Sequence, residues 1–73
     1  MSNPRQEANF ALIELLLEQI ERDPDLRFGQ VLWNLGIVIP DAAGGIVDPH
    51  AEEWLVTLNR AVQRVERLRR AAE

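Results

Sequence analysis

The sequence contains no cysteine, no tyrosine and no lysine, and it has a single histidine, His50. Without cysteine the chain forms no disulfide and offers no thiolate ligand for a metal. Serine and threonine occur once each, at Ser2 and Thr57. A nucleophile paired with a general base is therefore hard to assemble, and we expect a protein that is not an enzyme.

Long hydrophobic runs are also absent. No apolar stretch approaches the ~18–20 residues that span a bilayer, and the first residues lack the basic and apolar regions of a signal peptide. We therefore expect a cytoplasmic protein. One cluster of candidate metal ligands occurs in the sequence, without the paired spacing of a metal site, and we expect neither a metal nor a cofactor. The cluster consists of Asp48, His50, Glu52 and Glu53.

What the sequence does contain is typical of one small globular domain over residues 1–73. It is 47% hydrophobic and 27% charged, which is enough apolar material for a core. A chain of this size buries only about 60% of the surface that its unfolded form exposes. Association is a common remedy for so small a core, so we expect a homo-oligomer, most simply a homodimer.

The formal net charge of −4 is unevenly distributed. Residues 1–59 carry three arginines against ten acidic residues, whereas residues 60–73 carry five arginines against two. An acidic chain is a poor candidate for coating nucleic acid, although a local basic stripe can still contact phosphate.

The first helix is predicted over residues 4–22. Asn3 followed by Pro4 is typical of an N-cap with proline at the first helical position. At 100° per residue, one apolar arc of about 160° forms, which we expect to be buried. The arc consists of Phe10, Leu12, Ile13, Leu16, Leu17 and Ile20. An acidic stripe on the opposite side consists of Glu7, Glu14, Glu18 and Glu21. Leu15 lies outside the arc, and it either widens the buried face or remains exposed.

Two further helices and a connecting segment follow. Asp23-Pro24-Asp25 breaks the first helix and predicts a second over residues 25–35, with Gly36 as its C-terminal cap. Residues 36–47 contain two β-branched runs, which predict an apolar loop or a short β-ribbon. Asp48-Pro49 predicts a third helix over residues 49–71. The fold expected is therefore an all-α domain of three helices.

The third helix carries an apolar seam and an arginine stripe. The seam includes Trp54, Leu58, Ala61, Val65 and Leu68, in the alternating spacing of three and four that defines a heptad pattern. Its alanines make it shallow, which favours packing against the first helix of the same chain. The arginine stripe consists of Arg60, Arg64, Arg67 and Arg70.

The segment from Asp23 to Asn34 carries a resemblance. Its sequence, Asp-Pro-Asp-Leu-Arg-Phe-Gly-Gln-Val-Leu-Trp-Asn, is similar to the Pro-Asp/Glu-Leu-Arg-Phe/Leu-Gly-Gln segment of a group of small bacterial and phage-associated proteins. Residues Asp48 to Leu55 partly match a second feature of that group, an Asp-Pro step before the last helix. The resemblance implies a recurrent small fold and brings no established activity.

Candidate contact residues fall into three sets. The first set is apolar or near the second helix, and consists of Trp33, Arg27 and Gln30 there and Leu15 on the first helix. The second is the acidic stripe with Glu14, Glu18 and Glu21, and the third is Arg60, Arg64 and Arg67. If the first and third helices pack antiparallel, the two charged stripes point outward on opposite sides and are free to meet a partner.

These features favour a non-enzymatic protein-binding module that regulates or neutralises a protein partner, as inhibitors, immunity proteins and phage accessory proteins do. One alternative is a small dimeric regulator that uses the Arg60–Arg70 stripe on DNA. Another is a structural subunit in which the seam of the last helix assembles copies into a bundle.

Overall fold

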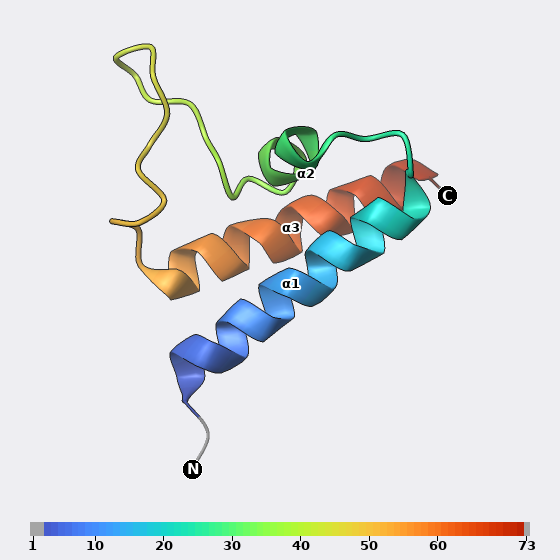
Figure 1. Ribbon diagram of the computed structural model, residues 1–73, viewed down its shortest axis with the longest axis horizontal. Coiled ribbons are helices and arrows are strands. Elements are labelled where there is room, and N and C mark those ends of the chain that lie inside the picture. The colour runs from blue at the N-terminus through green and yellow to red at the C-terminus, as the bar shows by residue number, and fades with distance from the viewer. Residues whose placement is uncertain (1–2, 73) are drawn as a thin grey trace.

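Three helices make up the computed structural model, which describes residues 3–72 (Figure 1). They are α1 (Pro4–Arg22), α2 (Phe28–Asn34) and α3 (Trp54–Ala72). The all-α, three-helix architecture is thereby confirmed, while residues 1, 2 and 73 of the predicted domain lie outside the described range. None of these helices is long and apolar enough to cross a bilayer.

Helix α1 begins and ends as the sequence predicts. The Asn3 side-chain oxygen accepts hydrogen bonds from the backbone N–H groups of Arg5, at 3.0 Å, and Gln6, at 3.3 Å. These are two of the donors that have no partner inside the helix. At the other end, Pro24 disfavours helical backbone at Asp23, and the helix ends at Arg22.

Helix α2 is shorter than the predicted 25–35, because it begins at Phe28. The Asp23-Pro24-Asp25 segment forms a separate turn, in which the N–H of Leu26 donates to the Asp23 carbonyl at 3.3 Å. Arg27, with extended backbone, takes the N-cap position, and its N–H donates to the Gln30 side chain at 2.9 Å. Neither Asp23 nor Asp25 caps this helix, since a glutamine inside the helix satisfies the cap.

The C-terminus of α2 is capped by glycine as predicted. Gly36 has φ of 71°, a left-handed conformation that side chains disfavour. Its N–H donates to the Trp33 carbonyl at 3.0 Å, and the N–H of Ile37 donates to Leu32 at 2.9 Å. This pair of bonds is a Schellman motif, which satisfies the last carbonyls and turns the chain sharply.

The segment after α2 contains one isolated antiparallel bridge, between Pro40 and Ile46, and no strand within the described residues. The N–H of Asp41 donates to the Gly45 carbonyl at 2.9 Å, and the N–H of Val47 donates to Ile39 at 3.0 Å. The two β-branched runs thus meet at a tight turn, which projects from the helices (Figure 1). A bridge of this length does not extend into a ribbon.

Helix α3 begins at Trp54, five residues later than the predicted start at residue 49. Asp48 is not its cap: the Asp48 side chain accepts from the His50 N–H at 2.9 Å and closes a turn of its own. The first helical carbonyl is that of Glu53, which accepts from Val56 at 3.1 Å and from Thr57 at 3.3 Å. Asp-Pro initiates a turn as readily as a helix, and here the turn forms.

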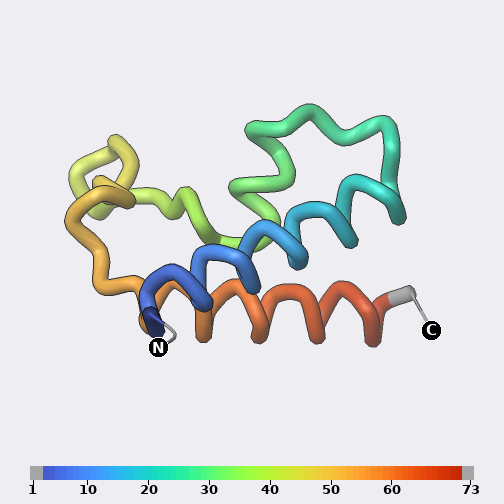
Figure 2. The backbone as a smooth tube through the Cα atoms, turned by 60° about the horizontal axis from the view of Figure 1, so that its bottom comes forward, coloured from blue at the N-terminus to red at the C-terminus, as the bar shows by residue number. Residues whose placement is uncertain are grey.

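Helices α1 and α3 run parallel, so the condition of antiparallel packing, under which the two charged stripes would point outward on opposite sides, is not met (Figures 1 and 2). Arg5, at the start of α1, lines one hollow with Trp54, at the start of α3. Near their far ends, Glu18 and Arg69 form an ion pair. Residues 23–53 connect the two helices and are long enough to return along α1, which measures about 28 Å.

The core lies between the three helices. Val31 of α2 and Leu35, which follows the end of α2, pack with Ala61 and Val65 of α3, and all four are buried. Partly buried apolar side chains surround them; these are Leu12, Leu15, Leu16, Leu26, Ile37 and Leu68. Ala61, Val65 and Leu68 of the α3 seam therefore pack inside the chain.

The buried face of α1 differs from the predicted arc. Ala8 and Gln19 are buried and Leu15 packs against the core, whereas Phe10, Ile13, Leu17 and Ile20 are exposed. From Leu15 round to Phe10 the apolar side chains span about 220° of the helix. Helices α2 and α3 cover only one side of so wide an arc, so the rest faces solvent. Leu15 thus widens the packed face of α1, which is one of the two alternatives that the sequence left open.

Truncation of two leucines of unequal burial tests this core. Leu35→Ala is expected to lower the free energy of unfolding by about 2–5 kcal/mol, because it leaves a cavity among buried side chains. Leu55→Ala is the matched control, since Leu55 is 49% exposed, and it should change stability by no more than about 0.5 kcal/mol. Urea denaturation followed by circular dichroism measures both, and equal losses would contradict the assigned core.

Candidate functional site

An exposed apolar stripe runs along α1 on the side away from α3. Its members are Phe10, Ile13, Leu17 and Ile20, with exposed fractions of 57%, 57%, 52% and 40%. Successive spacings of three, four and three residues place them on one line, as at the a and d positions of a heptad. We refer to these four residues as the α1 stripe.

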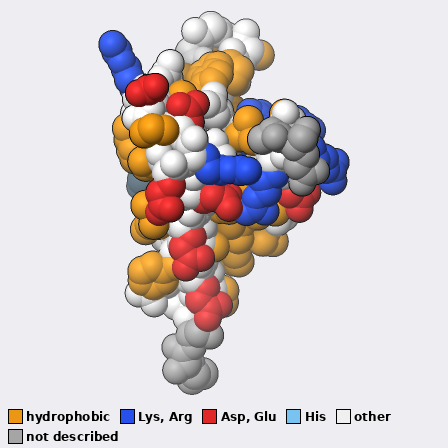
Figure 3. Space-filling view, turned by 90° about the vertical axis from the view of Figure 1, so that its right-hand side faces the viewer, with side chains coloured by type: hydrophobic (Ala, Val, Ile, Leu, Met, Phe, Trp, Pro, Cys, Tyr) orange, Lys and Arg blue, Asp and Glu red, His pale blue; other side chains and the backbone are white. Residues whose placement is uncertain are grey.

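A row of glutamates follows one edge of the α1 stripe. Glu7, Glu14 and Glu21 are seven residues apart, which places each at the same position beside the stripe. All three are exposed, and none forms an ion pair with another residue in the 3–72 range. Figure 3 shows acidic side chains in a column along α1, with hydrophobic side chains on both sides of it.

Glu18 does not belong to this row, although the sequence grouped it with Glu14 and Glu21. Both of its carboxylate oxygens accept hydrogen bonds from the Arg69 guanidinium, at 2.7 and 2.9 Å. Arg69 lies outside the predicted arginine stripe. The pair joins α1 to α3. Glu18 therefore stabilises the fold, whereas the other glutamates of the acidic stripe are exposed.

The second helix places its predicted contact residues differently. Trp33 is 48% exposed and Phe28 is 60% exposed, so both aromatic rings of α2 face solvent in large part. The Gln30 side chain is occupied by the cap of α2, where its oxygen accepts from the Arg27 N–H. Gln30 therefore positions the backbone, whereas Trp33 and the exposed Arg27 side chain remain on the surface.

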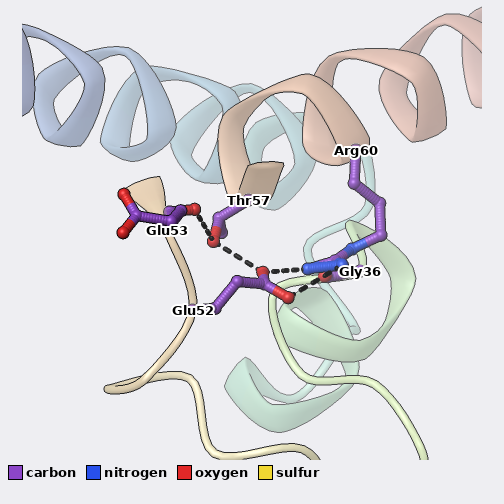
Figure 4. Close-up of polar contacts among 5 residues, drawn as sticks. All are labelled: Gly36, Glu52, Glu53, Thr57 and Arg60. Atoms are coloured by element: carbon purple, nitrogen blue, oxygen red, sulfur yellow. Dashed lines mark hydrogen bonds and ion pairs between the residues drawn. The ribbon is translucent and has the colours of Figure 1, made fainter. Parts of the chain in front are cut away.

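Arg60 lies inward, against the expectation that it belongs to an outward basic stripe. Its Nε donates to the Gly36 carbonyl at 2.6 Å, and its Nη1 donates to a Glu52 carboxylate oxygen at 3.2 Å (Figure 4). A second ion-pair contact joins Nη2 to Glu52. The guanidinium thus fastens the end of α2 and the segment before α3 to α3 itself.

Thr57 completes this cluster. Its hydroxyl donates to Glu52 Oε1 at 2.6 Å, so Glu52 accepts from Thr57 and Arg60 together (Figure 4). The Glu52 carboxylate is therefore engaged within the chain, where it stabilises the fold. We interpret the four residues as a polar clamp, which consists of Gly36, Glu52, Thr57 and Arg60.

The remaining arginines of the predicted stripe lie toward the end of α3. Arg64 is half-buried, while Arg67 and Arg70 are exposed. Arg60 is committed to the polar clamp, so the stripe does not continue along the helix. The basic surface is therefore smaller than the sequence indicated.

A cleft of about 380 Å³ opens near the start of α1 and of α3, and Arg5, His50, Glu53 and Trp54 are among the residues that line it. His50 is exposed at its rim. No three histidine, aspartate or glutamate side chains gather to hold a metal ion in the part of the chain that the structure describes. The charges in the cleft are mixed, and they define no single class of ligand.

Sequence reasoning missed the α1 stripe as a surface and Glu52 as a structural residue. A signal for the stripe was present: strict 3-4-3 spacing with glutamate repeating every seventh residue is the pattern of a helix that meets another helix. For Glu52 no comparable signal exists, since its contact with Arg60 depends on how α2 ends.

Comparison with protein-family models, with characterised proteins and with solved structures finds no match to this chain.

Two glycine substitutions of opposite effect test the polar clamp. Gly36→Ala should lower the free energy of unfolding by at least about 1–2 kcal/mol, because alanine disfavours left-handed backbone. The new methyl group would also meet the Arg60 side chain at 3.1 Å.

Gly29→Ala is the matched control, because nothing lies within 4 Å of an added methyl group there and the position is helical. It should raise stability by roughly 0.5–1 kcal/mol. Thermal and urea unfolding measure both variants, and a Gly36→Ala protein as stable as the native chain would contradict the clamp.

Proposed function

We propose that this chain is a non-enzymatic protein-binding module that docks a helix of its partner on the α1 stripe. The observation that carries the proposal is the exposure of four large apolar side chains, Phe10, Ile13, Leu17 and Ile20, in one line on a single helix. Contiguous apolar surface of this kind marks interaction sites on folded proteins.

A helix is the partner element that the α1 stripe accommodates best. Side chains in 3-4-3 spacing pack as knobs into the holes of a facing helix with the same periodicity. Burial of such surface stabilises a complex by roughly 25 cal/mol per Å² before the costs of association. Helix α1 is already braced by α3 and α2, so little ordering is needed when a partner binds.

The alternative of a DNA-binding regulator has less support. Arg60 is engaged by Gly36 and Glu52, and Arg69 is engaged by Glu18. A duplex would be met by the few remaining arginines of α3, next to an acidic surface that repels phosphate. The homo-oligomer and the regulatory role expected from the sequence stay predictions, and a second copy is one outcome of the experiment below.

Site-specific photo-crosslinking tests the proposal. A benzophenone amino acid replaces Phe10 in one protein and Phe28 in another; the two positions are 57% and 60% exposed, so they are matched in type and accessibility. In the cells that make the protein, the label at Phe10 should give a discrete crosslinked product. The label at Phe28 should give a weaker product or none.

A second substitution makes the result specific for the stripe. Leu17→Asp should remove the product from Phe10, because it places a charge in the α1 stripe. Val56→Asp, at a 52% exposed position on α3, should leave the product unchanged. Circular dichroism checks that both variants are folded. A product unaffected by Leu17→Asp, or none from Phe10, would refute the proposal; a product of twice the chain mass would identify a second copy.

A further inference from the structure

We infer that the helix docked on the α1 stripe is basic: an amphipathic helix of another protein, with arginine or lysine beside its apolar seam. This inference rests on the proposed docking of a helix, and it specifies the chemistry of the partner. The observation behind it is the row of Glu7, Glu14 and Glu21 at constant spacing along one edge of the stripe.

The positions of these glutamates are the ones that meet a partner. With Phe10 and Leu17 at a positions, Glu7, Glu14 and Glu21 occupy successive e positions. Residues at e and g flank the seam of paired helices, and their charges select the partner and its orientation. Glu18 is at a b position, farther from the α1 stripe, and it pairs with Arg69 of the same chain.

The α1 helix of a second copy does not supply positive charge to the glutamate row. In an antiparallel pair of α1 helices, e positions face e positions, so the row would meet its own copy and repel it. In a parallel pair, e positions face g positions, which here are Asn9, Leu16 and Asp23. Neither orientation places a positive side chain opposite a glutamate.

An anionic lipid surface is also a poor occupant of the α1 stripe. Helices that lie on membranes present lysine and arginine beside their apolar face, which attract anionic headgroups. Here the side chains beside the stripe are carboxylates, so the same surface would repel α1. A basic helix buries the apolar stripe and supplies opposite charge along its edge.

Two synthetic helical peptides test the inference directly. Both carry the same leucine and isoleucine seam; one has lysine and arginine at its flanking positions, and the other has glutamate at those positions. Fluorescence anisotropy measures the Kd of each peptide at ~50 mM and ~500 mM salt, because exposed charges are largely screened at the higher concentration. The basic peptide is expected to bind at least about tenfold more tightly at low salt, and the difference should shrink at high salt.

The triple variant Glu7→Gln, Glu14→Gln, Glu21→Gln removes the row and keeps its size. It should raise the Kd of the basic peptide by about tenfold at low salt and change it little at high salt.

A matched triple variant controls for net charge. Asp25→Asn, Glu53→Gln and Glu66→Gln remove three exposed acidic groups that lie away from the stripe, so both triple variants have the same formal charge. This control should change the Kd of the basic peptide by less than about twofold, since distant exposed charges are screened. Equal losses in the two triple variants would overturn the inference, because net charge alone would then explain binding.

Leu17→Asp separates the inference from the proposal on which it rests. If Leu17→Asp abolishes binding while the glutamate variant binds both peptides like the native chain, a helix docks on the stripe and the charge inference is wrong. If neither peptide binds, or if Leu17→Asp has no effect, the docking proposal fails as well. A dimer that depends on Leu17 and resists displacement by the basic peptide would identify a second copy and overturn the inference.

Discussion

The parallel packing of α1 and α3 determines most of this structure. Two neighbouring helices of one chain can run parallel only if the segment that connects them returns the full length of the first, and residues 23–53 do so. Helix α2 lies within that connection, and Val31 and the following Leu35 fill the space beside α3. The connection must then be held down, which the Arg60 guanidinium does by binding Gly36 and Glu52 together.

Local signals in the sequence predicted what depends on neighbouring residues. Asn3-Pro4 and Asp23-Pro24 fixed both ends of α1, and Gly36 marked the end of α2, because each acts through its own backbone. Asp48-Pro49 was ambiguous, since the same pair forms a turn or a cap, and the turn formed. The direction of α3 was beyond local reasoning, because it depends on contacts between residues about fifty positions apart.

The candidate site shows a related limit. Periodicity locates the apolar residues of a helix, but it does not say how much of a wide apolar arc its neighbours will cover. In α1 the arc includes both Leu15, which packs on the core, and Leu17, which does not. Only the packed arrangement separates them, and it leaves more apolar surface on α1 than so short a chain can bury. The α1 stripe is therefore exposed because α2 and α3 are too few to cover the whole apolar arc of α1.

The parallel arrangement also places the start of α1 and the end of α3 at opposite ends of the molecule (Figures 1 and 2). Tension applied through these two points would slide α1 along α3. In that shearing geometry the contacts between the helices, among them the Glu18–Arg69 pair, would be loaded together. Antiparallel helices joined by a short turn would peel apart one contact at a time. From this topology we expect a small domain to resist extension along its length.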